Sequence, residues 1–269
     1  MPTTNSNWNY KPKFQEESNF VKIEKIIIKD IPCLLFKPKD KKENHHTIIY
    51  YHGWSSNKDF QKFKGTVLAS FGFQVIIPDS IYHGDRNPIN HNLDGMLEKY
   101  FKKTILNSIE ESSIIIDYAL ENLNVESNKI GIMGHSMGGF ISSGAFIKNK
   151  NLKALVVING SCAWSKLEEK VDKYKDENNT SDVTKELMKY DPYHNYKDLE
   201  HRPVLLVHGE KDDTVPIYSQ EVFYEKILNY YKDHKKKLSF LKIPDMTHSV
   251  NTTMLENCIH WFKRYLSYN

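Results

Sequence analysis

The residues best suited to chemistry in this chain surround a serine between two glycines, in the run Gly134-His135-Ser136-Met137-Gly138. An apolar run precedes it and a helix-like segment of small residues follows, which predicts a strand, a sharp turn and a helix. A Cβ at either glycine would collide with a neighbouring strand or helix, so the tight turn requires both. A serine hydroxyl becomes a good nucleophile only when a base activates it. The pattern predicts that Ser136 is a nucleophile, provided that a base and an acid lie nearby.

Candidate acids follow the apolar run 203–207, which is typical of a buried strand. Glu210, Asp212 and Asp213 all lie in the polar loop after it. A carboxylate is needed there to orient a histidine base. The residues alone leave these three open, and a plain polar turn after a strand would also explain the glycine and the aspartates.

The candidate base is His248, which follows the strand expected at 238–243 and precedes the last helical segment. Serine catalysis requires a histidine that accepts the hydroxyl proton and later donates it to the leaving group. Most histidines in proteins have no catalytic role, so position has to decide among the candidates. Other histidines at expected strand ends are His52, His83, His135 and His208.

Composition limits the possible functions. The chain has 269 residues, and its 37 Lys+Arg nearly balance its 34 Asp+Glu, for a net charge of +3. This balance argues against a nucleic-acid partner. The three widely spaced cysteines, Cys33, Cys162 and Cys258, suggest neither a disulfide framework nor a zinc site. The start does not resemble a signal peptide and no apolar run is long enough for a membrane span, so we expect a cytoplasmic protein without a membrane partner.

Apolar runs alternate with helix-type patterns along the chain, which predicts an α/β fold with a mostly parallel, doubly wound sheet and helices on both faces. Length favours a single domain over residues 1–269. Residues 161–200 are strongly charged, and we expect them to form a small helical cap; an ordinary crossover connection of two helices is the alternative. The expected strands are 21–29, 31–37, 47–51, 73–77, the short apolar run that breaks at Gly134, 152–158, 203–207 and 238–243. The expected helices are 58–71, 94–123, 137–148, 217–231 and 250–265.

The serine motif resembles the nucleophile elbow Gly-x-Ser-x-Gly of the α/β-hydrolase superfamily, whose triad has the chain order serine, acid, histidine. Residues 209–216 resemble that superfamily's Gly-x-x-Asp-x-x-Val-Pro loop, and this match implies Asp212 as the acid. The histidine position also matches, although Met246 replaces the usual glycine two residues before His248. The later half resembles the catalytic domain of the prolyl oligopeptidase family, which includes single-domain bacterial esterases.

The same resemblance extends to two further loops. His52-Gly53 resembles the His-Gly oxyanion motif, which implies that the backbone amides of Trp54 and Met137 form the oxyanion hole. Residues 78–86 resemble a loop beside the active site of related esterases and peptidases, where it shapes the mouth of the pocket.

The resemblance implies a carboxylesterase that acts on small esters, with short acyl chains expected, through a Ser-His-Asp triad and an acyl-enzyme. It needs no metal and no cofactor, and a homodimer is possible. Ser136 excludes the nucleophilic cysteine of dienelactone hydrolases and the aspartate of dehalogenases. The alternatives are a thioesterase or acyl transferase, a non-catalytic binding protein, and a peptidase that holds a substrate amino terminus with Glu168, Glu169 or Asp172.

Overall fold

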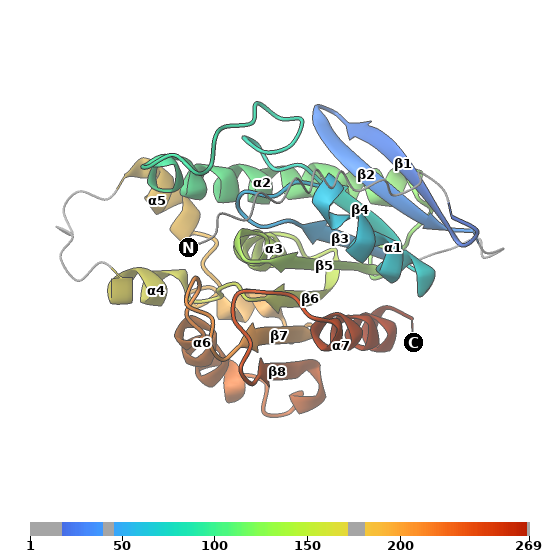
Figure 1. The fold of residues 1–269 in the computed structure, drawn as a ribbon. Coiled ribbons are helices and arrows are strands. Elements are labelled where there is room, and N and C mark those ends of the chain that lie inside the picture. Colours follow the sequence, from blue (N-terminus) through green and yellow to red (C-terminus); the bar gives the residue numbers. More distant parts are fainter. Residues whose placement is uncertain (1–17, 40–45, 172–180, 268–269) are drawn as a thin grey trace, which may run out of the picture.

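A computed structural model describes residues 18–39, 46–171 and 181–267. Its strands form one eight-stranded sheet in the order β1-β2-β4-β3-β5-β6-β7-β8 (Figure 1). The strand β2 is antiparallel to both of its neighbours, and the remaining pairs are parallel. The strands are β1 (Val21–Ile28), β2 (Ile31–Pro38), β3 (Thr47–Tyr51), β4 (Gln74–Pro78), β5 (Ile130–His135), β6 (Leu152–Ile158), β7 (Val204–Gly209) and β8 (Leu238–Ile243).

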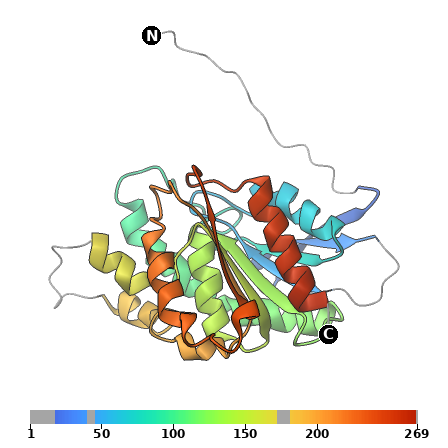
Figure 2. The ribbon, with the colours of Figure 1, turned by 90° about the horizontal axis from the view of Figure 1, so that it is seen from below.

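Helices cover both faces of this sheet (Figure 2). The helices α1 and α7 pack on one face, and α2, α3 and α6 pack on the other. Because both faces are covered, the central strands β3, β4 and β7 are buried at every position, as their continuous apolar runs predict. The α-helices are α1 (Lys62–Ser70), α2 (Met96–Asn122), α3 (Met137–Lys148), α4 (Trp164–Val171), α5 (Asp182–Met188), α6 (Tyr218–Leu228) and α7 (Thr252–Phe262).

The sequence prediction of an α/β-hydrolase-type fold is confirmed, with differences at the ends of elements. The helix expected over 58–71 starts later, because a 3-10 turn over Asp59–Gln61 precedes α1. The helix expected over 94–123 is one unbroken helix, α2, with a buried stripe that includes Ile105, Ile109 and Ile116. The division into one domain with a cap at 161–200 stays a prediction; the described part of that segment contains α4 and α5.

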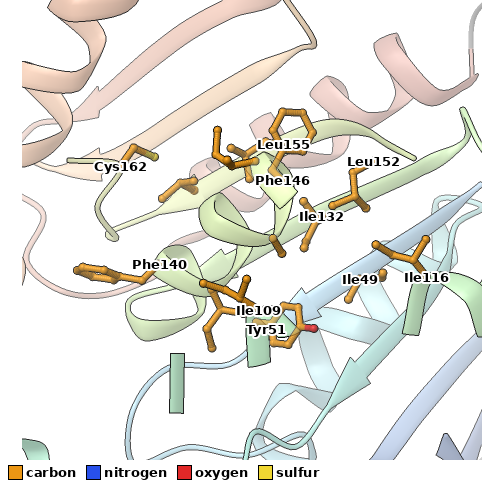
Figure 3. Close-up of a cluster of buried hydrophobic side chains, with 14 of the residues drawn as sticks. Ile49, Tyr51, Ile109, Ile116, Ile132, Phe140, Phe146, Leu152, Leu155 and Cys162 are labelled. Atoms are coloured by element: carbon orange, nitrogen blue, oxygen red, sulfur yellow. The ribbon is translucent and has the colours of Figure 1, made fainter. Parts of the chain in front are cut away.

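An apolar core lies between α3 and the sheet. Figure 3 shows part of this cluster, to which Ile49, Ile132 and Leu155 from three strands and Phe146 of α3 all belong. The carboxyl ends of parallel strands meet at one edge of a sheet, where α/β proteins place their ligands. Here that edge brings together the loops after β3, β5, β7 and β8.

Candidate active site

Ser136 lies at the apex of the turn between β5 and α3. Its backbone has φ 57° and ψ −122°, a strained conformation for a residue with a side chain. The turn is tight: a Cβ on Gly134 would come within 1.9 Å of the Gly138 oxygen, and a Cβ on Gly138 within 2.1 Å of the Tyr51 oxygen. The glycines therefore let α3 start directly against β3 and β5, which projects Ser136 out of the sheet edge.

The structure brings Ser136, His248 and Asp212 together in one hydrogen-bonded chain. His248 Nε2 lies 2.8 Å from Ser136 Oγ, and His248 Nδ1 lies 2.7 Å from Asp212 Oδ2. An ionised carboxylate only accepts, so Nδ1 carries the proton and donates it to Asp212. In neutral His248 this leaves the Nε2 lone pair facing the serine hydroxyl. The arrangement can therefore remove a proton from Ser136.

Asp212 is held by several donors at once. Its Oδ1 accepts from the amides of Thr214 (3.0 Å) and Val215 (2.9 Å), while His208 Nε2 lies 3.3 Å from Oδ2. Burial of this side chain would raise its pKa. Hydrogen bonds from His208 and His248 and the Val215 amide outweigh that effect and hold the pKa of Asp212 below its usual value. The acid is thus ionised across the neutral range, ready to stabilise a charged imidazole.

The rival residues lie elsewhere. Glu210 and Asp213 are exposed, and Asp213 accepts a bond from Thr214 Oγ1. His52 accepts the Ser80 amide proton at Nε2, and His208 donates to the Val215 oxygen. The ring of His135 packs 5.0 Å from that of His248, and His83 contacts the Ile81 oxygen through Nδ1. Of the five histidines considered from the sequence, His248 is the one bonded to the serine.

Two positioning groups were missed by sequence reasoning. Asn159, at the end of β6, accepts from the Gly209 amide and donates to the Ser249 oxygen, both at 3.0 Å. It therefore links the acid loop directly to the histidine loop. His208 was considered only as a rival base, whereas it supports Asp212. The signal for Asn159 was a polar residue directly after a buried strand, followed by glycine.

The region expected to form the oxyanion hole lies against Ser136. A Cβ on Gly53 would be 3.3 Å from Ser136 Cβ, so the loop that carries Trp54 passes beside the nucleophile. His52 fixes this loop: because its Nε2 accepts from the Ser80 amide, its Nδ1 carries the proton and donates to the Gly53 oxygen at 2.9 Å. Met137 is the first residue of α3, where amides have no acceptor within the helix. The donor roles of Trp54 and Met137 stay predictions.

The loop over residues 79–86 is fixed by buried charges beside Trp54. Asp79 is fully buried and accepts from the Lys58 amide (2.9 Å) and ammonium (2.7 Å). Arg86 makes a bidentate pair with Glu111, both distances 2.7 Å. The indole of Trp54 contacts the ring of His83 from this loop at 5.1 Å. These contacts hold the loop against Trp54; that it shapes the mouth of a pocket stays a prediction.

Histidines at the site are kept neutral by their surroundings. Burial, then the neighbouring His52, lowers the pKa of His83 to about 3. Burial, then His248 and Lys64, lowers the pKa of His135 to about 3. Both pKa values lie below that of an unfolded histidine, about 6.5. The unfolded chain therefore binds more protons than the folded one between these values.

We expect the free energy of unfolding to have its full value above pH 6.5 and to decrease as the pH falls from 6.5 towards 3. Each of the two histidines contributes a loss of about 1.4 kcal/mol per pH unit in this window. Urea unfolding at pH 7, 6, 5.5 and 5 measures it, and His83→Gln, which removes one titrating group, should flatten the slope. Equal stability at pH 7 and pH 5 would contradict the expectation.

The described residues contain no cluster of histidine, cysteine and carboxylate side chains arranged to hold a metal ion. Within the same residues, no helix has both the length and the apolar character to cross a membrane.

The chain is similar to known proteins over most of its length. The model of the prolyl oligopeptidase family matches residues 97–268. Among curated proteins, the chain is 29% identical to YitV of Bacillus subtilis over 259 residues, covering 91% of this chain and 100% of that protein. It is 22% identical to Esterase YjfP of Escherichia coli over 253 residues, again covering 91% of this chain and 100% of that protein.

Two solved structures are similar in fold. TT1662 from Thermus thermophilus has a TM-score of 0.76 at 17% identity, with 93% of this chain and 99% of that chain covered. Acetyl xylan esterase 1 from Thermoanaerobacterium has a TM-score of 0.64 at 17% identity, with 95% and 86% covered. At these identities the structures show the fold alone. The resemblance predicted from the sequence motifs is confirmed by the family match.

Proposed function

Because the chain belongs to the prolyl oligopeptidase family of hydrolases, we propose that it is a carboxylesterase that cleaves small esters through Ser136, His248 and Asp212. The observation that carries the proposal is the continuous hydrogen-bond chain from Ser136 Oγ through His248 to Asp212. The name of one relative, Esterase YjfP, supports the ester bond as the target.

The mechanism follows from the tautomer of His248. Its Nε2 takes the hydroxyl proton as Ser136 Oγ attacks the ester carbonyl carbon. Ionised Asp212 stabilises the imidazolium that forms. Collapse of the tetrahedral intermediate breaks the bond to the alcohol oxygen, which receives the proton from His248. Water, activated by the same histidine, then hydrolyses the acyl-enzyme and restores Ser136.

The negative oxygen of the tetrahedral intermediate needs donors that are already oriented. We assign them to the backbone amides of Trp54 and Met137. The close approach of Gly53 to Ser136 supports the first, and the position of Met137 at the start of α3 supports the second, since a helix N-terminus favours negative charge.

A peptidase that uses the same three residues is the main alternative. It would need a free carboxylate to bind a substrate amino terminus. Glu168 pairs with Lys102 at 2.6 Å and Glu169 pairs with Lys166 at 2.7 Å, so both candidates already have a cation. Asp172 lies outside the described residues. The pairing favours the esterase over the peptidase.

Parallel assays separate the two functions. Short-chain nitrophenyl esters and aminoacyl arylamides are offered to the same enzyme preparation, together with an acyl thioester. We expect kcat/KM to be highest on the esters; turnover of arylamides without turnover of esters would refute the proposal. Cytoplasmic location, the absence of nucleic-acid and membrane partners, and a homodimer stay predictions.

A further inference from the structure

His135 ends strand β5, directly before Ser136, and the proposed mechanism gives it no step. Its Nε2 is buried and has no hydrogen-bond partner among the described residues. An unpaired polar atom of this kind destabilises the folded state, and an apolar side chain of similar size would avoid that loss. A buried polar group without a partner therefore calls for a functional reason.

The ring of His135 packs against the ring of His248. The two centroids are 5.0 Å apart and the two planes are tilted by 37°, so the rings meet closer to face to face than to edge to face. Both nitrogens of His248 bond in the plane of its own ring, to Ser136 and to Asp212. These two bonds leave the ring able to turn about the line between its partners. A contact on the face of the ring restricts that rotation.

The charge of His248 changes during the proposed reaction. The ring is neutral while it faces Ser136, and it becomes an imidazolium when it takes the hydroxyl proton. A cation within about 6 Å of the centroid of an aromatic ring is attracted to the electrons of the ring face. The contact with His135, at 5.0 Å, lies within that range. Because the attraction arises only as the proton moves, it stabilises the transition state more than the ground state, which raises kcat.

This attraction requires His135 itself to stay uncharged. Burial, then His248 and Lys64, lowers the pKa of His135 to about 3. The weaker influences oppose one another, because Asp212 raises this pKa and His208 lowers it. At neutral pH the ring of His135 is therefore neutral, and it does not repel the imidazolium beside it.

We propose that His135 is a positioning residue whose neutral ring fixes the plane of His248 and stabilises its imidazolium form. The assignment rests on the proposed function, in which His248 is the base. An aliphatic side chain at this position would fill the space without offering a ring face. The requirement is for that face and not for a hydrogen bond, which explains why Nε2 can stay unpaired.

Two substitutions separate this role from a structural one. His135→Leu removes the ring, and we expect kcat on a butanoyl nitrophenyl ester to fall about fivefold, the size of a partly desolvated contact between a cation and a ring. The midpoint of the acid limb of kcat/KM should move about 0.7 pH units lower, because the imidazolium of His248 is then less stable. His135→Phe restores a ring, and it should keep kcat within about twofold of the wild type without lowering that midpoint.

The matched control is His260→Leu, the same change at an exposed histidine on α7. Its kcat should stay within about twofold of the wild type and its midpoint should not move. Thermal unfolding establishes which variants are folded. His135→Gln, which also lacks an aromatic ring, replaces His135→Leu if that variant does not fold.

An unchanged midpoint in the folded variant without a ring would overturn the assignment, since a purely structural role would lower kcat alike at every pH. A loss in His135→Phe as large as that in His135→Leu would overturn it too. Either result leaves the proposed function standing, because the wild type still hydrolyses esters. A wild-type enzyme that hydrolyses no ester would overturn the proposed function, and the assignment with it.

Discussion

Ser136→Ala is expected to lower kcat for ester hydrolysis by about 10⁶-fold, since loss of the nucleophile alone removes most of what a serine triad contributes. The change deletes one oxygen at a position where His248 Nε2 is its hydrogen-bond partner, 2.8 Å away. Alanine has the same backbone preferences as serine to a first approximation, so the strained turn at φ 57° stays equally strained. Steady-state rates on a butanoyl nitrophenyl ester measure the effect.

The control for this variant is Ser70→Ala, a serine at the exposed end of α1 whose hydroxyl donates to the Val67 oxygen. It should leave kcat within about twofold, because surface substitutions away from a functional site have small effects. Thermal unfolding of both variants establishes that each is folded. Full esterase turnover by folded Ser136→Ala would remove Ser136 from the mechanism.

Asp212→Asn is expected to reduce kcat by about 10⁴-fold, the size of effect seen when the acid of a serine triad is made neutral. The structure gives a reason specific to this chain. The amides of Thr214 and Val215 require an acceptor at Oδ1, so the new NH₂ group would face His248. His248 Nδ1 would then have to accept, its proton would move to Nε2, and Nε2 could no longer take the proton of Ser136.

The matched control is Asp213→Asn, one residue further along the same loop. Asp213 is exposed, so the same chemical change there should alter kcat by less than about twofold. Rates at saturating ester from pH 6 to 9 distinguish a shifted pH profile from a uniform loss. A larger loss at Asp213 than at Asp212 would show that the acid had been assigned to the wrong carboxylate.

Much of this arrangement could be predicted from the sequence because the motifs carry their own geometry. The tight turn around Ser136 has room only for glycine at the two flanking positions. The apolar runs before Asp212 and His248 are strands, and the ends of these strands must meet at one edge of the sheet. Family resemblance then selected Asp212 among three nearby carboxylates.

Contacts between distant segments could not be predicted in the same way. Asn159 joins the loops after β7 and β8, and its function depends on strand β6 lying beside β7, which sequence spacing does not reveal. The sequence places Asp79 only in the loop 78–86, yet its carboxylate is buried against Lys58, 21 residues away in the chain.

The most direct test of the central claim is covalent labelling with a fluorophosphonate probe, followed by peptide mapping. Such a probe reacts with a serine that a base has activated. We predict modification at Ser136 in the wild-type enzyme, and loss of that modification in His248→Ala. No labelling of the folded wild-type protein, or labelling at another serine while Ser136 stays unmodified, would contradict the mechanism.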